Sequence, residues 1–155
     1  MKNASSKKYT LTTIFVFLFF FVGISWFVAD RLGFVREKEK TLEINDAVFT
    51  VEIADTPGKQ IKGLSDRDHL DENKGMLFVF SEPAYYPFWM KDMLIPLDFI
   101  WIKGDKVVDV NQNIRPEDYP PPKYFTPKYP ADSVLEVNAG TVAKFNIKVG
   151  DKVSF

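Results

Sequence analysis

The hydrophobic positions divide the chain into two parts with different patterns. Residues 9–29, YTLTTIFVFLFFFVGISWFVA, form one apolar run without a charged side chain. From residue 42 onward, short apolar runs rich in Val, Ile, Phe and Trp alternate with polar residues, Pro and Gly. Short runs bounded by turn-forming residues are typical of β-strands. The pattern therefore predicts a long apolar segment followed by a β-rich domain over residues 42–155.

The β-rich domain is predicted to contain short strands, tight turns and one or two short helices. Asn45-Asp46 suits a hairpin turn, because both residues tolerate positive φ. Thr56 followed by Pro57 is a typical helix start. The expected strands cover residues 42–44, 47–53, 76–80, 88–91, 97–102, 106–110, 133–138 and 153–155, and the expected helices cover 57–64 and 141–145. This content indicates a single small domain, mainly β, built as a β-sandwich or a partly open β-barrel.

Alternation along the predicted strands assigns faces to two carboxylates. Asp98 faces away from Phe99, and Glu136 faces outward, away from Leu135. Residues 111–132 are rich in proline and in aromatic side chains. The prolines forbid a regular helix or an inner strand. We expect that segment to form a loop that packs on the domain as a lid or rim.

The apolar run at residues 9–29 has the length of a membrane span. At 1.5 Å per residue, a helix of about 21 residues crosses a hydrocarbon core of about 30 Å. Asp30 and Arg31 close the run, and such charges are costly inside a bilayer. We therefore expect an N-terminal transmembrane helix, with a basic tail at residues 1–8 and a charged linker at residues 30–41.

Two alternatives to an uncleaved anchor stay open from the sequence. A cleaved signal peptide needs small residues before its cleavage site, and Phe27 before Ala29 fits this need poorly. A buried core helix is the other alternative. Positive charges on the two sides of the run do not decide its orientation. Because most of the chain follows the run, we expect a single-pass protein in the cell membrane with its domain outside the cytoplasm, or a secreted domain if cleavage occurs.

Composition removes several classes of function. The chain has no cysteine and a single histidine, His69, which excludes thiolate metal sites, histidine pairs and a cysteine nucleophile. We accordingly predict no metal and no cofactor. Three of the 20 basic residues precede residue 30, and none of the 21 acidic residues does. The resulting excess of acid in the domain argues against nucleic acid as a partner.

Four stretches of the domain follow the motifs of a known family. They are GLSDRDHLDENKGMLFVF (63–80), FWMKDMLIPLDFIWI (88–102), VVDV (107–110) and VLEVNAGTVAKFNIKVGDKV (134–153). Over about residues 42–155, the chain resembles the DUF192 family of domains of unknown function. The resemblance implies a compact, mainly β fold that often follows a signal or anchor. It implies no activity, because none is established for the family.

Two short stretches depart from the family's motifs. Ser65 and Asp66 stand where Met and Phe are usual, whereas the arginine that follows is kept as Arg67. Asp92-Met93 replaces the usual Asn-Thr. If the asparagine usual in the family were catalytic, this chain would have an anionic carboxylate, that of Asp92, in place of the neutral amide.

Five side chains in or beside the apolar stretches are candidate ligand-binding residues. Asp98 and Glu136 could act as acid and base, hold Ca²⁺ with backbone carbonyls, or pair with cations inside the fold. Arg67 could bind an anion or make a structural salt bridge through the same bidentate geometry. Trp89, close to Lys91, could form an aromatic platform for a sugar or cation, or pack in the core.

These observations support three hypotheses about function. The leading one is a membrane-anchored, non-enzymatic domain outside the cytoplasm that binds a small polar ligand, sugar-like or anionic, or a partner in the cell envelope. The second is an envelope hydrolase or lyase that uses Asp98 and Glu136 as acid and base. The third is a structural or assembly module. The second requires the two carboxyl groups to lie about 5–9.5 Å apart across an open cleft.

Overall fold

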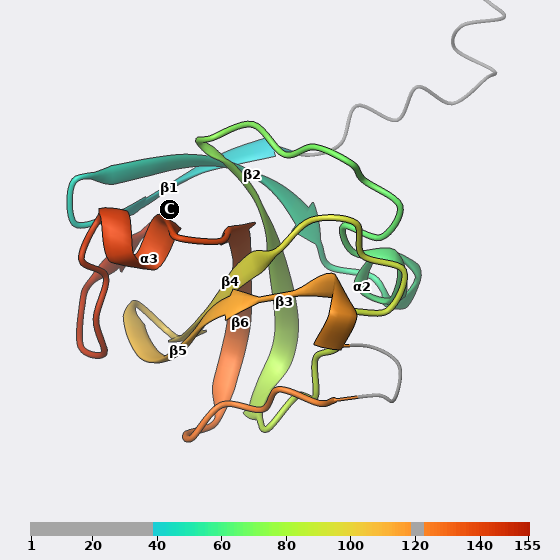
Figure 1. Ribbon diagram of the computed structural model, residues 1–155. Helices are drawn as coiled ribbons and strands as arrows, with labels where there is room; N and C mark the ends of the chain where they lie inside the picture. Colours follow the sequence, from blue (N-terminus) through green and yellow to red (C-terminus); the bar gives the residue numbers. More distant parts are fainter. Residues whose placement is uncertain (1–38, 119–122) are drawn as a thin grey trace, which may run out of the picture. The chain divides into compact units, whose positions relative to one another are not determined.

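The computed structural model describes residues 39–118 and 123–155 (Figure 1). The predicted tail at residues 1–8 and the predicted membrane span at residues 9–29 lie outside these ranges. Among the described residues, no helix combines the length and the apolar character that crossing a bilayer requires. Residues 37–155 form one compact unit by themselves.

One curved sheet dominates this unit. Its strands are β1 (Glu39–Ile44), β2 (Ala47–Ala54), β3 (Lys74–Ala84), β4 (Leu97–Lys103), β5 (Lys106–Ile114), β6 (Ala131–Asn138) and β7 (Val153–Ser154). Their order across the sheet is β5-β4-β6-β3-β2-β1-β7. Neighbouring strands are antiparallel, except that β2 and β3 are parallel. All strands except β5 and β7 therefore pair with a neighbour along both of their edges.

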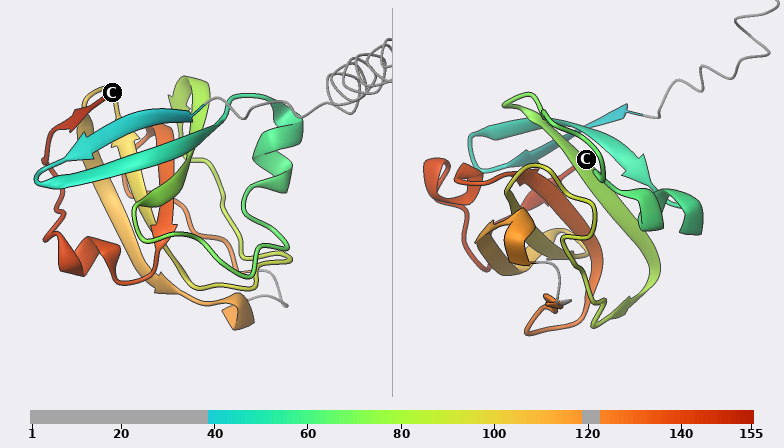
Figure 2. Two further views of the ribbon diagram at one scale, coloured as in Figure 1. Left: turned by 90° about the horizontal axis from the view of Figure 1, so that it is seen from above. Right: turned by 45° about the vertical axis from the view of Figure 1, so that its right-hand side comes forward.

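The sheet curls into a half-barrel, whose curvature is visible in Figure 2. Backbone hydrogen bonds connect each edge strand, β5 and β7, to the turn that precedes the other. Val107 in β5 donates its N–H to the carbonyl of Asp151 at 2.9 Å, and Val153 in β7 donates to Asp105 at 2.8 Å. The predicted single domain of mainly β structure is thus confirmed. Of the two architectures expected, the curled sheet agrees with the partly open barrel.

Two short α-helices complete the described part of the domain. Helix α2 (Pro57–Lys62) begins where its capping signal predicts, and the Thr56 hydroxyl accepts the N–H of Lys59 at 3.4 Å. It ends before Gly63, which adopts a φ of 49°. Helix α3 (Thr141–Lys144) precedes β7 and lies on the opposite side of the domain from α2 (Figure 1). Helix α2 also supplies the crossover that the parallel pair of β2 and β3 requires.

Buried side chains form two hydrophobic clusters, which we call the first and second core clusters. The first contains Ile100 and Leu135, and the second contains Phe78, Phe99 and Trp101. Successive residues of β4 belong to different clusters because side chains alternate between the two faces of a strand. Strands β4 and β6 are buried on both faces, which explains their nearly unbroken hydrophobic runs.

Three expectations about individual segments are wrong. Residues 88–91 do not form a strand, since Phe88 makes only an isolated bridge to Phe125. Strand β5 continues to Ile114 and shortens the loop expected from residue 111. Glu136 was expected to face outward, yet only 5% of it is exposed. Its strand, β6, is buried along both of its faces, which strand alternation alone does not reveal.

Candidate functional site

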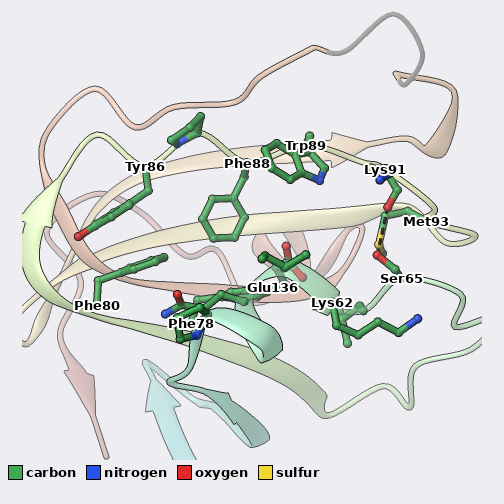
Figure 3. Close-up of a pocket in the computed structure, with 16 residues that line it drawn as sticks. Lys62, Ser65, Phe78, Phe80, Tyr86, Phe88, Trp89, Lys91, Met93 and Glu136 are labelled. Atoms are coloured by element: carbon green, nitrogen blue, oxygen red, sulfur yellow. Dashed lines mark hydrogen bonds between the residues drawn. The ribbon is translucent and has the colours of Figure 1, made fainter.

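A cavity of about 240 Å³ lies between the sheet and helix α2 (Figure 3). Strands β3 and β6 contribute its base, α2 and the residues that follow it form one wall, and the segment from residue 86 to residue 93 forms the other. Most of its lining is apolar. The main apolar side chains are those of Leu64, Phe78, Phe80, Phe88 and Met93.

Glu136 is the acidic side chain at the base of this cavity. It lies beside Met76 of β3 and Phe99 of β4, both of which belong to the second core cluster. No described residue makes a hydrogen bond or an ion pair with its carboxyl group, whose oxygens open onto the cavity. In Figure 3 its side chain lies among those of Phe88 and Met93. The site therefore combines an apolar enclosure with one polar group that lacks a partner.

Burial raises the pKa of Glu136 from its ordinary value of 4.5 to about 8. Desolvation disfavours the charged form of a carboxyl group, and no nearby cation compensates for it here. The group is consequently neutral for most of the time at pH 7, and a neutral carboxyl group can both donate and accept a hydrogen bond. A strongly shifted carboxyl group in a cavity is a frequent property of functional sites.

The mouth of the cavity carries two lysines, each beside an acidic residue. Lys62 forms an ion pair with Asp66, and the Nζ of Lys91 lies 4.0 Å from the carboxylate of Asp92. The charges at the mouth therefore nearly cancel. The ring of Trp89 is 39% exposed at the same opening.

Two loops meet at the mouth and are joined by hydrogen bonds. The N–H of Asp66 donates to the carbonyl of Asp92 at 2.8 Å, and the hydroxyl of Ser65 donates to the carbonyl of Lys91 at 3.1 Å. Asp66 and Asp92 have φ values of 63° and 56°. Asp and Asn adopt this left-handed conformation more readily than other residues with a side chain. These bonds hold the two walls of the cavity together.

Comparison with known proteins assigns the domain to a family. The model of DUF192, a family described as Uncharacterized ACR, matches residues 40–155. This chain belongs to the DUF192 family. No curated protein matches it.

Two solved structures resemble the DUF192 domain of this chain. The crystal structure of a protein of unknown function from Novosphingobium aromaticivorans is 32% identical, with a TM-score of 0.72, and the match covers 79% of this chain and 89% of that one. A candidate transcription regulator from Sinorhizobium meliloti is 28% identical, with a TM-score of 0.71, and the match covers 76% of this chain and 94% of that one. The match thus spans nearly the whole of both solved chains.

Family membership gives the departure at Asp92 a structural reason. The DUF192 motif usually has Asn at this position, and the φ of 56° is accessible to Asn and Asp alike. The exchange therefore preserves the turn. Ser65, which stands where the motif has Met, lines the cavity and bonds to the opposite loop.

The structure brings three of the five predicted site residues together. Trp89, Lys91 and Glu136 all line the cavity. The proline-rich loop, which was expected to form the rim, is adjacent: its Tyr124 ring packs edge-on against the ring of Trp89, with centroids 5.8 Å apart. None of the loop's described residues lines the cavity itself.

Arg67 lies outside the cavity and makes a structural salt bridge. Its two terminal nitrogens contact the two carboxylate oxygens of Glu52 at 2.5 and 2.6 Å. This hydrogen bonding to Arg67 lowers the pKa of Glu52, against the opposing effect of its partial burial. Because Glu52 belongs to β2, the pair fastens the loop after α2 to the sheet.

Asp98 is fully buried and bonded to the backbone on both sides. One carboxylate oxygen accepts the N–H of Asn113 at 2.8 Å, and the other accepts the N–H of Val142 at 2.9 Å. Val142 belongs to the first turn of α3, where a carboxylate satisfies free N–H groups. These contacts favour the structural interpretation of Asp98.

Asp98 and Glu136 do not share a cleft. Asp98 pairs with Val137 across the β4–β6 ladder, whereas Glu136 pairs with Phe99. Directly opposite residues lie on the same face and successive residues on opposite faces, so the two carboxyl groups lie on opposite faces of the sheet. Within residues 39–118 and 123–155, no group of three acidic or histidine side chains could hold a metal ion.

Sequence reasoning missed the aromatic lining of the cavity. The rings of Phe80 and Tyr86 are stacked with centroids 3.6 Å apart, and those of Phe78 and Phe88 meet edge-on at 4.9 Å. Phe78 and Phe80 follow the strand period along β3, which marks them as one face of a buried strand. Periodicity alone does not distinguish core packing from the wall of a cavity, because that depends on how closely α2 and residues 86–93 cover them.

Proposed function

We propose that this DUF192 domain binds a small organic molecule in the cavity beside α2, and that it acts as a binding module and not as an enzyme. One observation carries the proposal: Glu136 places a carboxyl group without a partner at the base of a cavity lined by aromatic rings. Because its oxygens open onto the cavity, a bound molecule can supply the hydrogen-bond partner that the described residues do not. Apolar cavities with few polar groups of this kind are typical binding sites.

The lining changes the class of ligand that the sequence favoured. A sugar-like or anionic molecule was expected, but most of the surface is apolar, and the carboxyl group at the base repels anions whenever it is ionised. Ligand pockets usually enclose about 300–1,000 Å³, and this cavity is smaller, at about 240 Å³. A small molecule with a flat apolar body and one hydrogen-bonding group fits these properties.

The two alternative functions have less support. An acid–base hydrolase needs a second carboxyl group near Glu136, and Asp98 lies on the other face of the sheet with both oxygens bonded. A purely structural role for both carboxylates would place each in a salt bridge without a cavity. Glu136 instead faces the cavity and has no such pair among the described residues.

The two tryptophans of residues 37–155 provide a direct test. Trp89 lies at the mouth of the cavity, whereas Trp101 is fully buried and donates its indole N–H to Asn111 at 2.7 Å. In proton–nitrogen NMR spectra of residues 37–155, we expect 2-phenylethanol to shift the indole resonance of Trp89 and to leave that of Trp101 in place. Glucose at the same concentration should shift neither resonance.

Two matched variants distinguish binding in the cavity from binding on the exposed surface. Trp89→Ala removes one wall and should weaken binding of 2-phenylethanol by about tenfold, equivalent to about 1.4 kcal/mol. Tyr85→Ala is the control, since Tyr85 is 58% exposed and does not line the cavity. Equal shifts of both indole resonances, or equal losses in both variants, would contradict the proposal.

A further inference from the structure

We infer that the cavity selects an organic amine: a protonated nitrogen on an apolar, ring-bearing body, with its N–H groups donated to the carboxyl group of Glu136. The inference rests on the proposed function and names the ligand class of the same site. It follows from the position of the carboxyl group, the charges around it and the rings that enclose it.

The carboxyl group of Glu136 is placed to receive a donor from the ligand. Glu136 is only 5% exposed, its oxygens open onto the cavity, and no described side chain or backbone group supplies them with a proton donor. A ligand that brings a charged nitrogen forms a charge-assisted hydrogen bond, which is about twice as strong as a neutral one. A carboxylate ligand would meet a like charge wherever Glu136 is ionised, that is, from about pH 8 upward.

The other charges around the cavity leave this preference intact. Helix α2 contributes Lys62, which is paired with Asp66, and residues 86–93 contribute Lys91, which lies beside Asp92. Both lysines lie at the mouth, and their side chains are more than half exposed.

The adjoining strands add no unpaired charge. On the same face of the sheet, β2 carries Glu52, which is neutralised by Arg67. Strands β3 and β4 place Met76 and Phe99 directly beside Glu136. Any negative charge at the base of the cavity therefore comes from the ionised form of Glu136.

The aromatic rings of the cavity also favour a cationic ligand. Phe78, Phe88 and Trp89 line the cavity together with Glu136. The face of an aromatic ring is electron-rich and attracts cations, more strongly where water is excluded. A carboxylate enclosed by such rings favours an amine over a neutral alcohol of the same shape.

Binding of an amine should be coupled to release of a proton. Burial holds the proton on Glu136 up to about pH 8, and a bound cation would stabilise the deprotonated form. Lys and Asp side chains do not usually titrate between pH 6 and 8. The single histidine, His69, bonds to Asp71 and does not line the cavity.

Three probes of matched shape test the inference on residues 37–155 by isothermal titration calorimetry. They are phenethylamine, 2-phenylethanol and 3-phenylpropionate. At pH 8 we expect phenethylamine to bind about tenfold more tightly than 2-phenylethanol, as a charge-assisted bond predicts. Between pH 6 and pH 8 its affinity should rise about 50-fold by proton linkage, whereas that of the alcohol should stay constant. The anion should bind most weakly.

The variant Glu136→Gln separates charge selection from general binding. In E136Q the affinity for phenethylamine should fall to that of the alcohol and lose its dependence on pH, while 2-phenylethanol still binds. The Trp101 indole resonance reports whether the variant is folded. If E136Q does not fold, the ratio of amine to alcohol and the pH dependence of the unmodified domain decide by themselves.

Each other outcome has a distinct meaning. Equal binding of amine and alcohol, or an affinity for amine that does not change with pH, overturns the inference and leaves the proposed binding function standing. Preference for 3-phenylpropionate overturns it as well. Failure of all three probes to bind or to shift the Trp89 resonance overturns both.

Discussion

Among single residues, two buried carboxyl groups of the domain have opposite roles. Asp98 accepts two backbone N–H groups and stabilises the junction of β4, β5 and α3. Glu136 has no described partner and opens onto a cavity. The sequence predicted that both charges interrupt apolar strands. It did not separate their roles, because strand period assigns a face and says nothing of what packs on that face.

Glu136 should make the stability of the domain depend on pH. Its pKa is about 8 in the folded state and near 4.5 in the unfolded state. The folded state therefore retains the proton between these values, and the free energy of unfolding falls as pH rises through this window. We expect E136Q to gain about 3.5 kcal/mol relative to the unmodified domain between pH 5 and pH 8, because the slope approaches 1.36 kcal/mol per pH unit between the two pKa values and flattens near each of them.

Urea unfolding of both proteins at pH 5 and at pH 8 measures this difference. The control is Glu43→Gln, because Glu43 is an exposed residue of β1. A difference between E136Q and the unmodified domain that stays constant with pH would show that the carboxyl group of Glu136 is solvated or paired.

Asp98 should matter for stability and not for binding. Asp98→Asn leaves one oxygen acceptor for two backbone N–H groups, so we expect the free energy of unfolding to fall by about 1–3 kcal/mol. Affinity for 2-phenylethanol, measured well below the melting temperature, should not change. Loss of binding in a variant of unchanged stability would contradict the assignment.

Among helices and strands, the turn and capping residues of the sequence were sufficient to predict where an element begins or ends. The Asn45-Asp46 turn joins β1 and β2, with Asn45 at a φ of 54°. The start of α2 follows its capping residue. Residues 88–91 were mistaken for a strand because apolar character alone suggested one. They pair only at Phe88, which packs against the second core cluster, and Met90 is a member of that cluster.

The close approach of β3 and β6 sets the base of the cavity and can be tested at Gly75. A Cβ atom at this position would lie 2.8 Å from the backbone carbonyl oxygen of Glu136 and 3.1 Å from Leu135 and Val137 side-chain atoms. We expect Gly75→Ala to lower the free energy of unfolding by about 1–3 kcal/mol through overpacking. It should also weaken binding, because it displaces the strand that carries Glu136.

Gly58 provides the matched substitution in α2. A Cβ atom there meets no atom within 4 Å. Gly58→Ala should therefore raise the free energy of unfolding by about 0.5 kcal/mol, because alanine restricts the unfolded chain. Denaturant unfolding of both variants measures the contrast. Similar effects of the two substitutions would argue against a close contact between β3 and β6.

At the scale of the whole molecule, family membership and fold agree, and the motifs along residues 63–153 were enough to identify both. The curvature of the sheet and the cavity beside α2 could not be predicted, since both arise from the packing of segments that are distant in sequence. Gln60 illustrates this: its side chain in α2 donates to the carbonyl of Val79 in β3 at 2.9 Å.

We propose that residues 9–29 anchor the chain in the cell membrane, with the DUF192 domain outside the cytoplasm. The apolar length of about 21 residues supports this proposal. In cell fractionation we expect the full chain to stay in the membrane pellet after an alkaline carbonate wash, and a chain of residues 30–155 to be soluble. A full-length chain in the soluble fraction would contradict anchoring, and a shortened product there would indicate a cleaved signal.

The carboxyl group of Glu136, unpaired at the base of the cavity, is proposed to receive the ligand. Carbon-13 NMR of the Glu136 carboxyl carbon measures this directly, because the carbon reports the protonation state of the group. In residues 37–155 without ligand, this carbon should titrate with a pKa near 8. With saturating phenethylamine, the same carbon should report a carboxylate at pH 7 and titrate well below that pH. Titration near 4.5 in the free domain, or a curve unchanged by the amine, would contradict the account.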